Sequence, residues 1–327
     1  MTCLSAEKER TSVMSITNQK AREIFENHPT RFTKKEKTAL RSTLRSELTR
    51  MGYPEEAIAE IRQSGTNLLV GDPHAEYMFT AHYDTPGRTG WMLKTASLWG
   101  QTGANIFLIA IMCLLGFTVP LSGAMLFPEA PGDLLFWSGE LSILLILLIM
   151  LISMVIKNKN NRNDNTSGVL SLLCLAEQIA SDEEMKKKCC FVFFDNEEWG
   201  LLGSAGFAKH CKKNGIDLSG TKVINFDCVG CGDVLTFAYT KKSGVADALA
   251  KAFGEAGQES VKKHSAMIFL SDHANFMNSV MVSYTKKSRM GLLYLPLIHS
   301  GADKVCDIDQ INRLTGDIFS FAKEGKI

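Results

Sequence analysis

Acidic and histidine side chains recur directly after segments of this sequence that have the composition of β-strands. The cases are "EYMFTA" followed by His82 and Asp84, "CCFVFFD" followed by Glu197 and Glu198, "KVINF" followed by Asp227, and "LLYLPLI" followed by His299. In open α/β sheets, ligands bind outside the carboxyl ends of the strands. Imidazole and carboxylate groups are common protein ligands of divalent metals. The pattern therefore predicts one shared metal site at this edge of the sheet.

Asp164 adds a fifth loop to this set. It lies in "NRNDNTSG", just ahead of an amphipathic segment whose first turn Asn165, Thr166 and Ser167 could cap. Taken singly, a histidine after a strand is more often a hydrogen-bonded surface residue, and two adjacent glutamates are usually solvated. Packing gives no reason, however, for one ligand type to recur after successive strands. Gathered like charges also destabilise a fold unless a cation neutralises them, so we expect a cation where the loops meet.

Strand-like and helix-like segments alternate along the part of the chain that carries these residues. We expect strands over residues 66–72, 76–82, 189–195, 222–227, 233–239, 280–285 and 292–298, and helices over residues 168–180 and 244–256. This alternation predicts an α/β fold whose sheet is covered on both faces. Residues 1–66 are charged and helix-prone, with Leu40, Leu44 and Leu48 at helical spacing, and predict a helical lead-in.

Two long apolar runs interrupt the chain before Asp164. No charged residue occurs from Thr95 to Pro128, and residues 134–156 hold a single acid, Glu140. Buried core helices are the commoner fate of short apolar segments, but each run reaches the roughly 20 residues that a bilayer requires. We therefore predict a transmembrane helical hairpin over residues 95–156, in contact with lipid.

The residues that flank this hairpin predict its orientation. Trp91, Trp99 and Trp137 lie where membrane interfaces favour aromatic anchors. Basic residues occur on both flanks, namely Arg88 and Lys94 before the hairpin and Lys157, Lys159 and Arg162 after it, whereas the connecting loop "FPEAPGD" has none. By the positive-inside tendency, both flanks are cytoplasmic. Residues before and after the hairpin can share a site only if the chain crosses the bilayer an even number of times, which agrees with two spans.

The composition restricts the class of protein further. A formal net charge of +1 gives no electrostatic reason to expect a nucleic-acid partner. Nine cysteines without a short spaced framework are typical of a reducing compartment. The segment "MTCLSAEKERTSVMSITNQKAREIF" lacks the apolar core of a secretory signal. We therefore expect an integral membrane protein with its main domain and both termini in the cytoplasm, and the sequence indicates no oligomeric state.

Six ordered motifs resemble those of the M28 family of zinc-dependent exopeptidases, of the aminopeptidase Y type. They are "AHYDTP", "DNTSGV", "NEEWGLLGS", "NFDCVG", "SDHANF" and "IHSGAD". The resemblance covers roughly residues 66–94 and 157–315. It implies a mixed, mostly parallel central sheet flanked by helices, in a catalytic domain of residues 67–94 and 157–327. The hairpin of residues 95–156 is the departure, because ordinary family members have a short connection there.

The resemblance also implies a role for each residue at the predicted edge. The family pattern holds two zinc ions, one by His82 and Asp227 and the other by Glu198 and His299, with Asp164 bridging both. Asp84 would orient the His82 imidazole by accepting its other N–H, and Glu197 would be the general base. Three carboxylates and a bridging hydroxide balance the charge of two divalent cations. Mixed donors of this kind suit zinc, with Co²⁺ or Mn²⁺ as substitutes.

The motif "SDHANF" matches family positions that line the substrate pocket, which makes Ser271, Asp272, His273 and Phe276 candidate pocket residues. A purely structural role is the alternative. Asp272 and His273 are adjacent and point in different directions on a regular backbone, so we do not expect a Ser-His-Asp triad. For Trp199, the sequence leaves open whether it walls the pocket or packs inside the fold.

The predicted function is that of a membrane-anchored two-zinc metallopeptidase acting on peptides. We expect an aminopeptidase for short peptides, with a metal-bridging hydroxide as nucleophile and Glu197 as general base. A glutaminyl-cyclase-like enzyme with a single zinc is one alternative, against which the complete set of five ligands argues. A catalytically dead membrane scaffold is another, but such a protein should have lost ligands or the base. If the hairpin holds the catalytic edge near the bilayer, hydrophobic peptides would be favoured.

Overall fold

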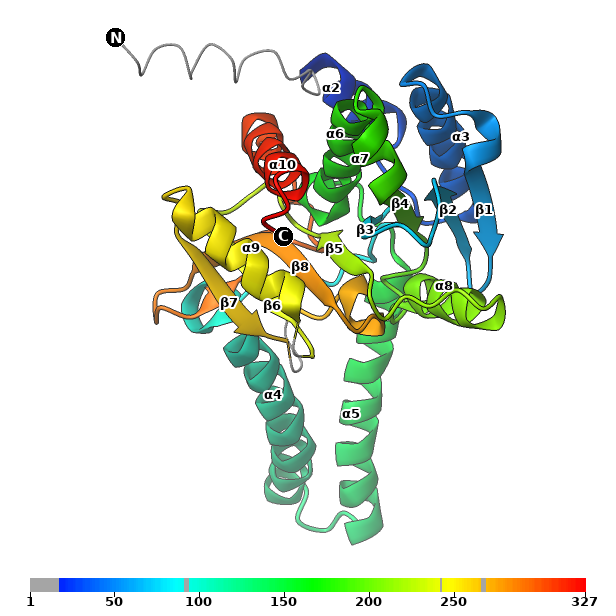
Figure 1. The fold of residues 1–327 in the computed structure, drawn as a ribbon. Coiled ribbons are helices and arrows are strands. Elements are labelled where there is room, and N and C mark those ends of the chain that lie inside the picture. Colours follow the sequence, from blue (N-terminus) through cyan, green and yellow to red (C-terminus); the bar gives the residue numbers. More distant parts are fainter. Residues whose placement is uncertain (1–17, 91–93, 242, 266–268) are drawn as a thin grey trace.

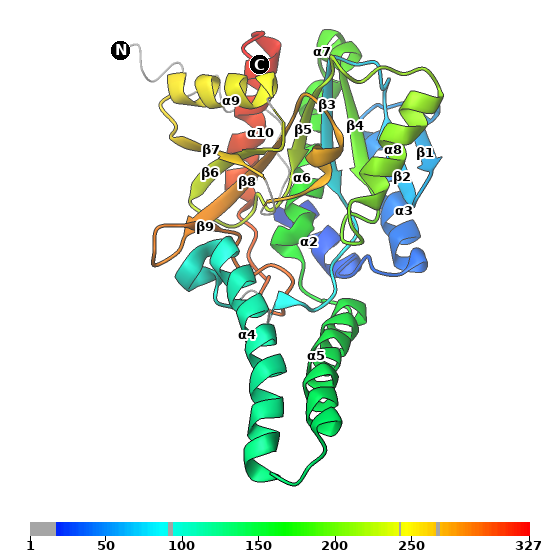
Figure 2. The same cartoon turned by 90° about the horizontal axis from the view of Figure 1, so that it is seen from below.

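The computed structural model describes residues 18–90, 94–241, 243–265 and 269–327 (Figure 1). Trp91 and the first 17 residues of the predicted lead-in lie outside this part of the chain. An α/β body carries two long helices that project from one side of it, and a second view shows the same arrangement (Figure 2).

A mixed sheet forms the centre of the body. Its strand order is β1-β2-β4-β3-β5-β8-β6-β7, and β9 pairs with β8. The strands are β1 (Ile58–Arg62), β2 (Thr66–Val70), β3 (Tyr77–His82), β4 (Cys189–Phe194), β5 (Lys222–Phe226), β6 (Val234–Tyr239), β7 (Ser260–His264), β8 (Ser279–Lys287) and β9 (Leu293–Tyr294). The central strands β4, β3, β5 and β8 are parallel, whereas β2 and β6 flank them in antiparallel pairs. The prediction of a mixed α/β sheet is confirmed, and β3, β4 and β5 end at one edge.

Helices cover both faces of this sheet. They are α2 (Asn18–Asn27), α3 (Lys34–Arg50), α6 (Ser167–Ala180), α7 (Glu183–Lys188), α8 (Leu202–Lys213), α9 (Gly244–Glu255) and α10 (Ile308–Lys323), with short helical turns η2 (Glu55–Ala57), η4 (Arg162–Thr166) and η5 (Asp272–Asn275). Helix α3 begins at a capping box formed by Thr33 and Glu36. Helices α3, α6, α9 and α10 pack on one face, and α8 packs on the other.

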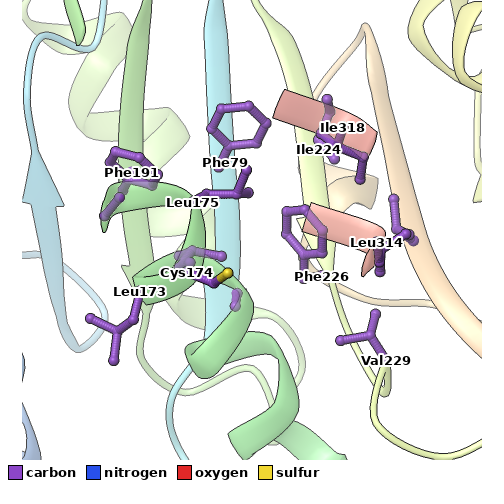
Figure 3. Packing of buried hydrophobic residues seen from close by; sticks show 14 of the residues in the cluster. Phe79, Leu173, Cys174, Leu175, Phe191, Ile224, Phe226, Val229, Leu314 and Ile318 are labelled. Carbon is purple, nitrogen blue, oxygen red and sulfur yellow. The ribbon is translucent and has the colours of Figure 1, made fainter. Parts of the chain in front are cut away.

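Alternation along the strands divides the core between the two faces. Phe79 of β3 packs with Leu173 of α6 and Leu314 of α10 in one cluster (Figure 3). Its neighbour Met78 belongs to the cluster on the opposite face, with Phe207 of α8. Because successive side chains of a strand point to opposite faces, a strand buried on both needs a continuous apolar sequence. The "CCFVFF" run of β4 meets that requirement. The buried strand therefore determines where the following loop, which carries Glu197 and Glu198, begins.

The two projecting helices are α4 (Ala96–Leu126) and α5 (Gly132–Val155), which pack against each other. Within them, Thr102–Leu126 and Gly132–Val155 are long and apolar enough to cross a membrane, and 0% and 6% of their most apolar windows are buried. Phe117 on α4 is 71% exposed. An apolar surface of this extent is unfavourable in water. The two predicted apolar helices are therefore present, with their outer faces uncovered.

The segments before and after this hairpin meet beside β3. Gly87 and Lys157 form an antiparallel bridge, and the Arg88 N–H donates to the Ile156 carbonyl at 2.8 Å. A Cβ atom on Gly87 would lie 2.2 Å from the carbonyl oxygen of Met154, so this close approach requires glycine. The chain thus leaves the body and returns to it at adjacent points.

Three segments differ from the expectations. The prediction of a helical lead-in over residues 1–66 is wrong for β1, because residues 58–62 gain ladder hydrogen bonds by pairing with β2. Strand β7 has the sequence "SVKKH", which shows no apolar run or alternation that would predict a strand. The strand expected over residues 292–298 is reduced to β9, because Pro296 has no N–H with which to continue a ladder.

Candidate metal centre

His82, Asp164 and Asp227 come together at the carboxyl edge of the sheet. His82 ends β3, Asp227 follows β5, and Asp164 lies in η4 ahead of α6. His82 Nε2 lies 3.4 Å from Asp164 Oδ1 and 3.7 Å from Asp227 Oδ1. All three residues are buried, and one ligand atom of each lies within 4.8 Å of the others. The three side chains are close enough to share one cation.

Asp164 also belongs to a second group, with Glu198 and His299. His299 Nε2 lies 3.0 Å from Asp164 Oδ2 and 3.5 Å from Glu198 Oε2. The ligand atoms of this group also lie within 4.8 Å of one another. The two carboxylate oxygens of Asp164 therefore face different imidazoles, Oδ1 towards His82 and Oδ2 towards His299. A carboxylate that bridges two cations needs this disposition.

The loop that carries His299 is fixed by the segment on the other side of the hairpin. Thr89 Oγ1 lies 2.9 Å from His299 Nδ1, and the Gly90 N–H donates to the His299 carbonyl at 2.8 Å. A Cβ atom on Gly90 would come within 2.9 Å of that carbonyl oxygen. His299 has a φ of 55°, which residues with a Cβ rarely adopt. The Thr89 contact occupies Nδ1 and leaves Nε2 directed at the acidic groups.

Asp84 links the first loop of the edge to the loop after β4. Its Oδ1 accepts the Glu197 N–H at 3.1 Å, and its Oδ2 accepts the Glu198 N–H at 3.4 Å. The same Oδ1 lies 3.5 Å from His82 Nδ1, which is longer than a normal hydrogen bond. Asp84 therefore lies beside the imidazole without accepting its N–H, and its predicted role in orienting His82 stays a prediction. It also positions the two glutamates, which the sequence did not indicate.

Crowding of acidic groups shifts the pKa values at this edge. Burial raises the pKa of Glu197 well above its usual range, and Glu198 adds to this effect while His82 opposes it. Burial also raises the pKa of Glu198, with Asp164 contributing. For His82, burial lowers the pKa, but Glu197 and the surrounding aspartates outweigh burial and raise it overall. In the metal-free site, Glu197, Glu198 and His82 therefore hold their protons to higher pH than usual.

Unpartnered polar atoms indicate where that charge belongs. Among the described residues, Glu198 Oε1 and His82 Nδ1 are buried without a hydrogen-bond partner. A buried carboxylate oxygen without a partner is unfavourable, and a divalent cation would satisfy it. Two imidazoles and three carboxylates form a donor set that suits zinc. The residues present therefore fit a metal centre at this position.

Asp303 supports the edge, and the sequence analysis did not single it out. Its carboxylate accepts the N–H groups of Asn163 at 2.8 Å and Asp164 at 3.0 Å. Burial raises the pKa of Asp303 to about 7, although these two hydrogen bonds lower it. The signal available in the sequence was its place in "IHSGAD", four residues after His299.

Arg31 is a second supporting residue that the sequence analysis missed. It is 1% exposed, and its guanidinium donates to the Tyr83 carbonyl and to Thr166 Oγ1, both at 2.8 Å. Burial lowers the pKa of Arg31 to about 10, while Asp84 and Asp164 raise it. The guanidinium places one positive charge behind the acidic edge. No local pattern marks Arg31, because it reaches the site from the segment before α3.

The "SDHANF" residues lie below the edge and are buried. Ser271, Asp272 and His273 are 0% exposed and Phe276 is 3% exposed. Phe276 stacks on Phe194 with a centroid distance of 6.0 Å. Burial raises the pKa of Asp272 to about 7 and lowers that of His273 to about 4. Whether these residues shape the substrate pocket or serve only the fold stays a prediction.

Comparison with known protein families places this geometry in context. Residues 157–313 match the sequence profile of peptidase family M28. The match indicates a peptidase M28 domain in this segment, which is just under half of the chain. Asp164, Glu198, Asp227 and His299 lie inside the matched residues, whereas His82 precedes them and the hairpin. A search of curated protein sequences returns no match.

Solved structures share the fold of this chain. The LapA aminopeptidase of Legionella pneumophila is 16% identical with a TM-score of 0.58, covering 100% of this chain and 75% of that chain. A Zn-dependent exopeptidase from Parabacteroides distasonis is 16% identical with a TM-score of 0.58, and the match covers 94% of this chain and 98% of that chain. Porphyromonas gingivalis glutaminyl cyclase is 16% identical with a TM-score of 0.58, and the match covers 93% of this chain and 95% of that chain. At these identities the likeness shows the fold.

A cavity of about 270 Å³ is lined both by residues of the candidate metal centre and by residues of the hairpin. Its wall includes Glu198 and His299 from the cluster, Phe32 and Trp199 from the body, and Leu108, Met150 and Met154 from α4 and α5. The Phe32 and Trp199 rings are 6.1 Å apart. Trp199, whose role the sequence left open, therefore lines a cavity and is 44% exposed.

Proposed function

We propose that the chain is a zinc-dependent aminopeptidase that holds two zinc ions. The observation that carries this proposal is the Asp164 carboxylate, whose two oxygens face the two imidazoles at 3.4 and 3.0 Å. His82 and Asp227 would hold one ion, Glu198 and His299 the other, and Asp164 both. The match to peptidase family M28 supports hydrolysis of a peptide bond by this centre.

Glu197 is the proposed general base. Bound zinc would lower the pKa of a water molecule and polarise the scissile carbonyl. Glu197 would accept the proton of that water and donate it to the leaving amine. In the metal-free site, burial and the neighbouring Glu198 raise the pKa of Glu197. The hydrogen bond from the Glu197 N–H to Asp84 holds the backbone in place during both transfers.

We further propose that the α4–α5 hairpin anchors this peptidase in a membrane. Two apolar helices with uncovered outer faces support insertion. The bridge between Gly87 and Lys157 supports a topology in which the residues before and after the hairpin would lie on one side of the bilayer. With basic residues on both flanks, that side would be the cytoplasm. Catalysis would then take place directly beside the membrane surface.

The experiment is metal analysis of the purified full-length chain in detergent, combined with hydrolysis of three matched short peptides. One peptide has both ends free, one is blocked at its amino end, and one is blocked at its carboxyl end. About two zinc ions per chain, with cleavage of all but the amino-blocked peptide, is the expected result. Cleavage of only the peptides with a free carboxyl end would show a carboxypeptidase and contradict the aminopeptidase assignment.

The same experiment separates the alternatives. A glutaminyl cyclase would bind one zinc and convert a peptide with N-terminal Gln to its pyroglutamyl form without hydrolysis. The fold does not discriminate, because the Porphyromonas cyclase and the LapA aminopeptidase give equal TM-scores of 0.58. A scaffold without catalytic function would leave every peptide intact even when loaded with zinc.

A further inference from the structure

The inner face of the hairpin contributes to the cavity at the metal cluster. Leu108 of α4 and Met150 and Met154 of α5 share its wall with Glu198 and His299. Leu108 and Met150 are half-buried, whereas the neighbouring Ile109 on α4 is 58% exposed. The two helices therefore present different faces to the cavity and to their surroundings. A simple tether would not need to reach the catalytic groups.

The wall of this cavity combines a few polar groups with a mainly apolar lining. Glu198 and His299 supply a carboxylate and an imidazole, Thr89 and Asn105 are also polar, and the other side chains of the wall are apolar. Sites for small ligands combine an apolar lining with a few polar groups that orient the ligand. A peptide end has this same combination, because its polar backbone adjoins a side chain. The two methionines add adaptability, since their unbranched side chains accommodate different apolar shapes.

We infer that this cavity is the specificity pocket for a large apolar residue next to the scissile bond, and that the hairpin builds half of it. The inference rests on the proposed peptidase function and names its substrate class: peptides that begin with residues such as leucine, methionine or phenylalanine. Phe32 and Trp199 form the wall on the side of the body. The helices supply the opposite wall through Leu108, Met150 and Met154.

The position of the pocket along the helices extends this inference. Leu108 lies six residues after Thr102, where the apolar stretch of α4 begins, and Met150 lies five residues before Val155, where that of α5 ends. At 1.5 Å per residue, both are roughly 8–9 Å inside the apolar stretch. In a bilayer that the hairpin spans, the pocket would therefore lie within the outer part of the acyl-chain region. An apolar side chain of the substrate would not have to leave an apolar environment to enter it.

Filling the pocket from the hairpin tests this assignment. Leu108→Trp and Met150→Trp add bulk to the wall, and Ile109→Trp and Ile149→Trp add the same bulk to outward positions that are 58% and 46% exposed. All variants are assayed as zinc-loaded full-length protein in lipid nanodiscs. The readout is kcat/KM for a peptide series that differs only in its first residue: Ala, Leu, Met, Phe, Asp and Lys. Zinc content and thermal unfolding report that each variant is folded.

We expect the wild-type chain to favour the Leu, Met and Phe peptides over the Ala peptide by about 10-fold or more, and to disfavour Asp and Lys, as apolar pockets discriminate by this amount. The inward Trp variants should lose most of that preference, measured as the ratio of kcat/KM for the Leu and Ala peptides. The outward variants should retain the preference. Equal kcat/KM for Ala and Leu peptides, or equal losses in the inward and outward variants, would overturn the inference. No hydrolysis of any peptide by the wild-type chain would instead refute the peptidase function.

Discussion

The backbone N–H of Asp164 donates to Oδ2 of Asp303 at 3.0 Å, so one buried carboxylate positions another. We expect Asp303→Ala to weaken zinc binding by about 10- to 100-fold, because the loop that carries Asp164 loses its support. Asp303→Asn should weaken zinc binding less than Asp303→Ala, since the amide oxygen of Asn can still accept one N–H. Zinc titration of metal-stripped protein against a competing chelator measures both. Asp309→Ala, at an exposed position of α10, is the control and should leave affinity unchanged. Unchanged affinity in Asp303→Ala would contradict this role.

Replacement of Glu197 by Gln should separate metal binding from turnover. The amide keeps the size of the side chain but cannot accept the proton of the attacking water. We expect a loss in kcat of about 10²- to 10⁴-fold with zinc content and thermal unfolding close to those of the wild-type chain. Metal analysis and kinetics on the same preparation provide the test. Near-normal turnover of the Glu197→Gln variant would show that Glu197 is not the general base.

Zinc binding should release protons and tighten as pH rises. The pKa values of Glu198 and His82 are raised in the metal-free site, mainly by burial for Glu198 and by the surrounding acids for His82. A ligating glutamate must be ionised and a ligating imidazole neutral, so protons compete with zinc below these raised pKa values. Affinity should therefore fall as pH falls. Calorimetry in buffers of different ionisation enthalpy counts the protons, and binding without proton release would contradict the prediction.

Gly87→Ala should disturb the junction between the hairpin and the metal cluster. The new Cβ would lie 2.2 Å from the Met154 carbonyl oxygen, so α5 or the loop after β3 must move. Overpacking of this kind costs about 1–3 kcal/mol of the free energy of unfolding. The preference for large apolar substrates should also decrease, because Met154 lines the pocket. Gly220→Ala is the control, since a Cβ there meets nothing within 4 Å.

The sequence predicted the parts of the fold that carry their own local signal. The apolar runs of β3, β4 and β5 and the amphipathic α6 were predicted because burial dictates their composition. Strand β1 was mistaken for helix, because its stability comes from pairing with β2, which no local pattern records. His82 and Asp227 could be assigned to the same edge because parallel strands end together.

Residues that act through tertiary contacts escaped the sequence analysis. Arg31 precedes α3 and reaches the acidic edge only after folding brings it to Thr166, 135 positions further along the chain. The contact of Met150 with the cavity is equally non-local, because it depends on which face of α5 turns inward. Periodicity identified α5 as an apolar helix but could not assign its faces, since the helix is apolar all round.

The bridge between Gly87 and Lys157 has a consequence for how such a protein could arise. Because the hairpin departs and returns at neighbouring backbone atoms, its presence leaves the pairing of β3 with β4 and β5 undisturbed. A soluble ancestor could thus acquire the whole segment in one genetic event without refolding its sheet. By our inference, the same event would bring a new wall to the catalytic cavity. Membrane attachment and a new substrate preference would then have a single origin.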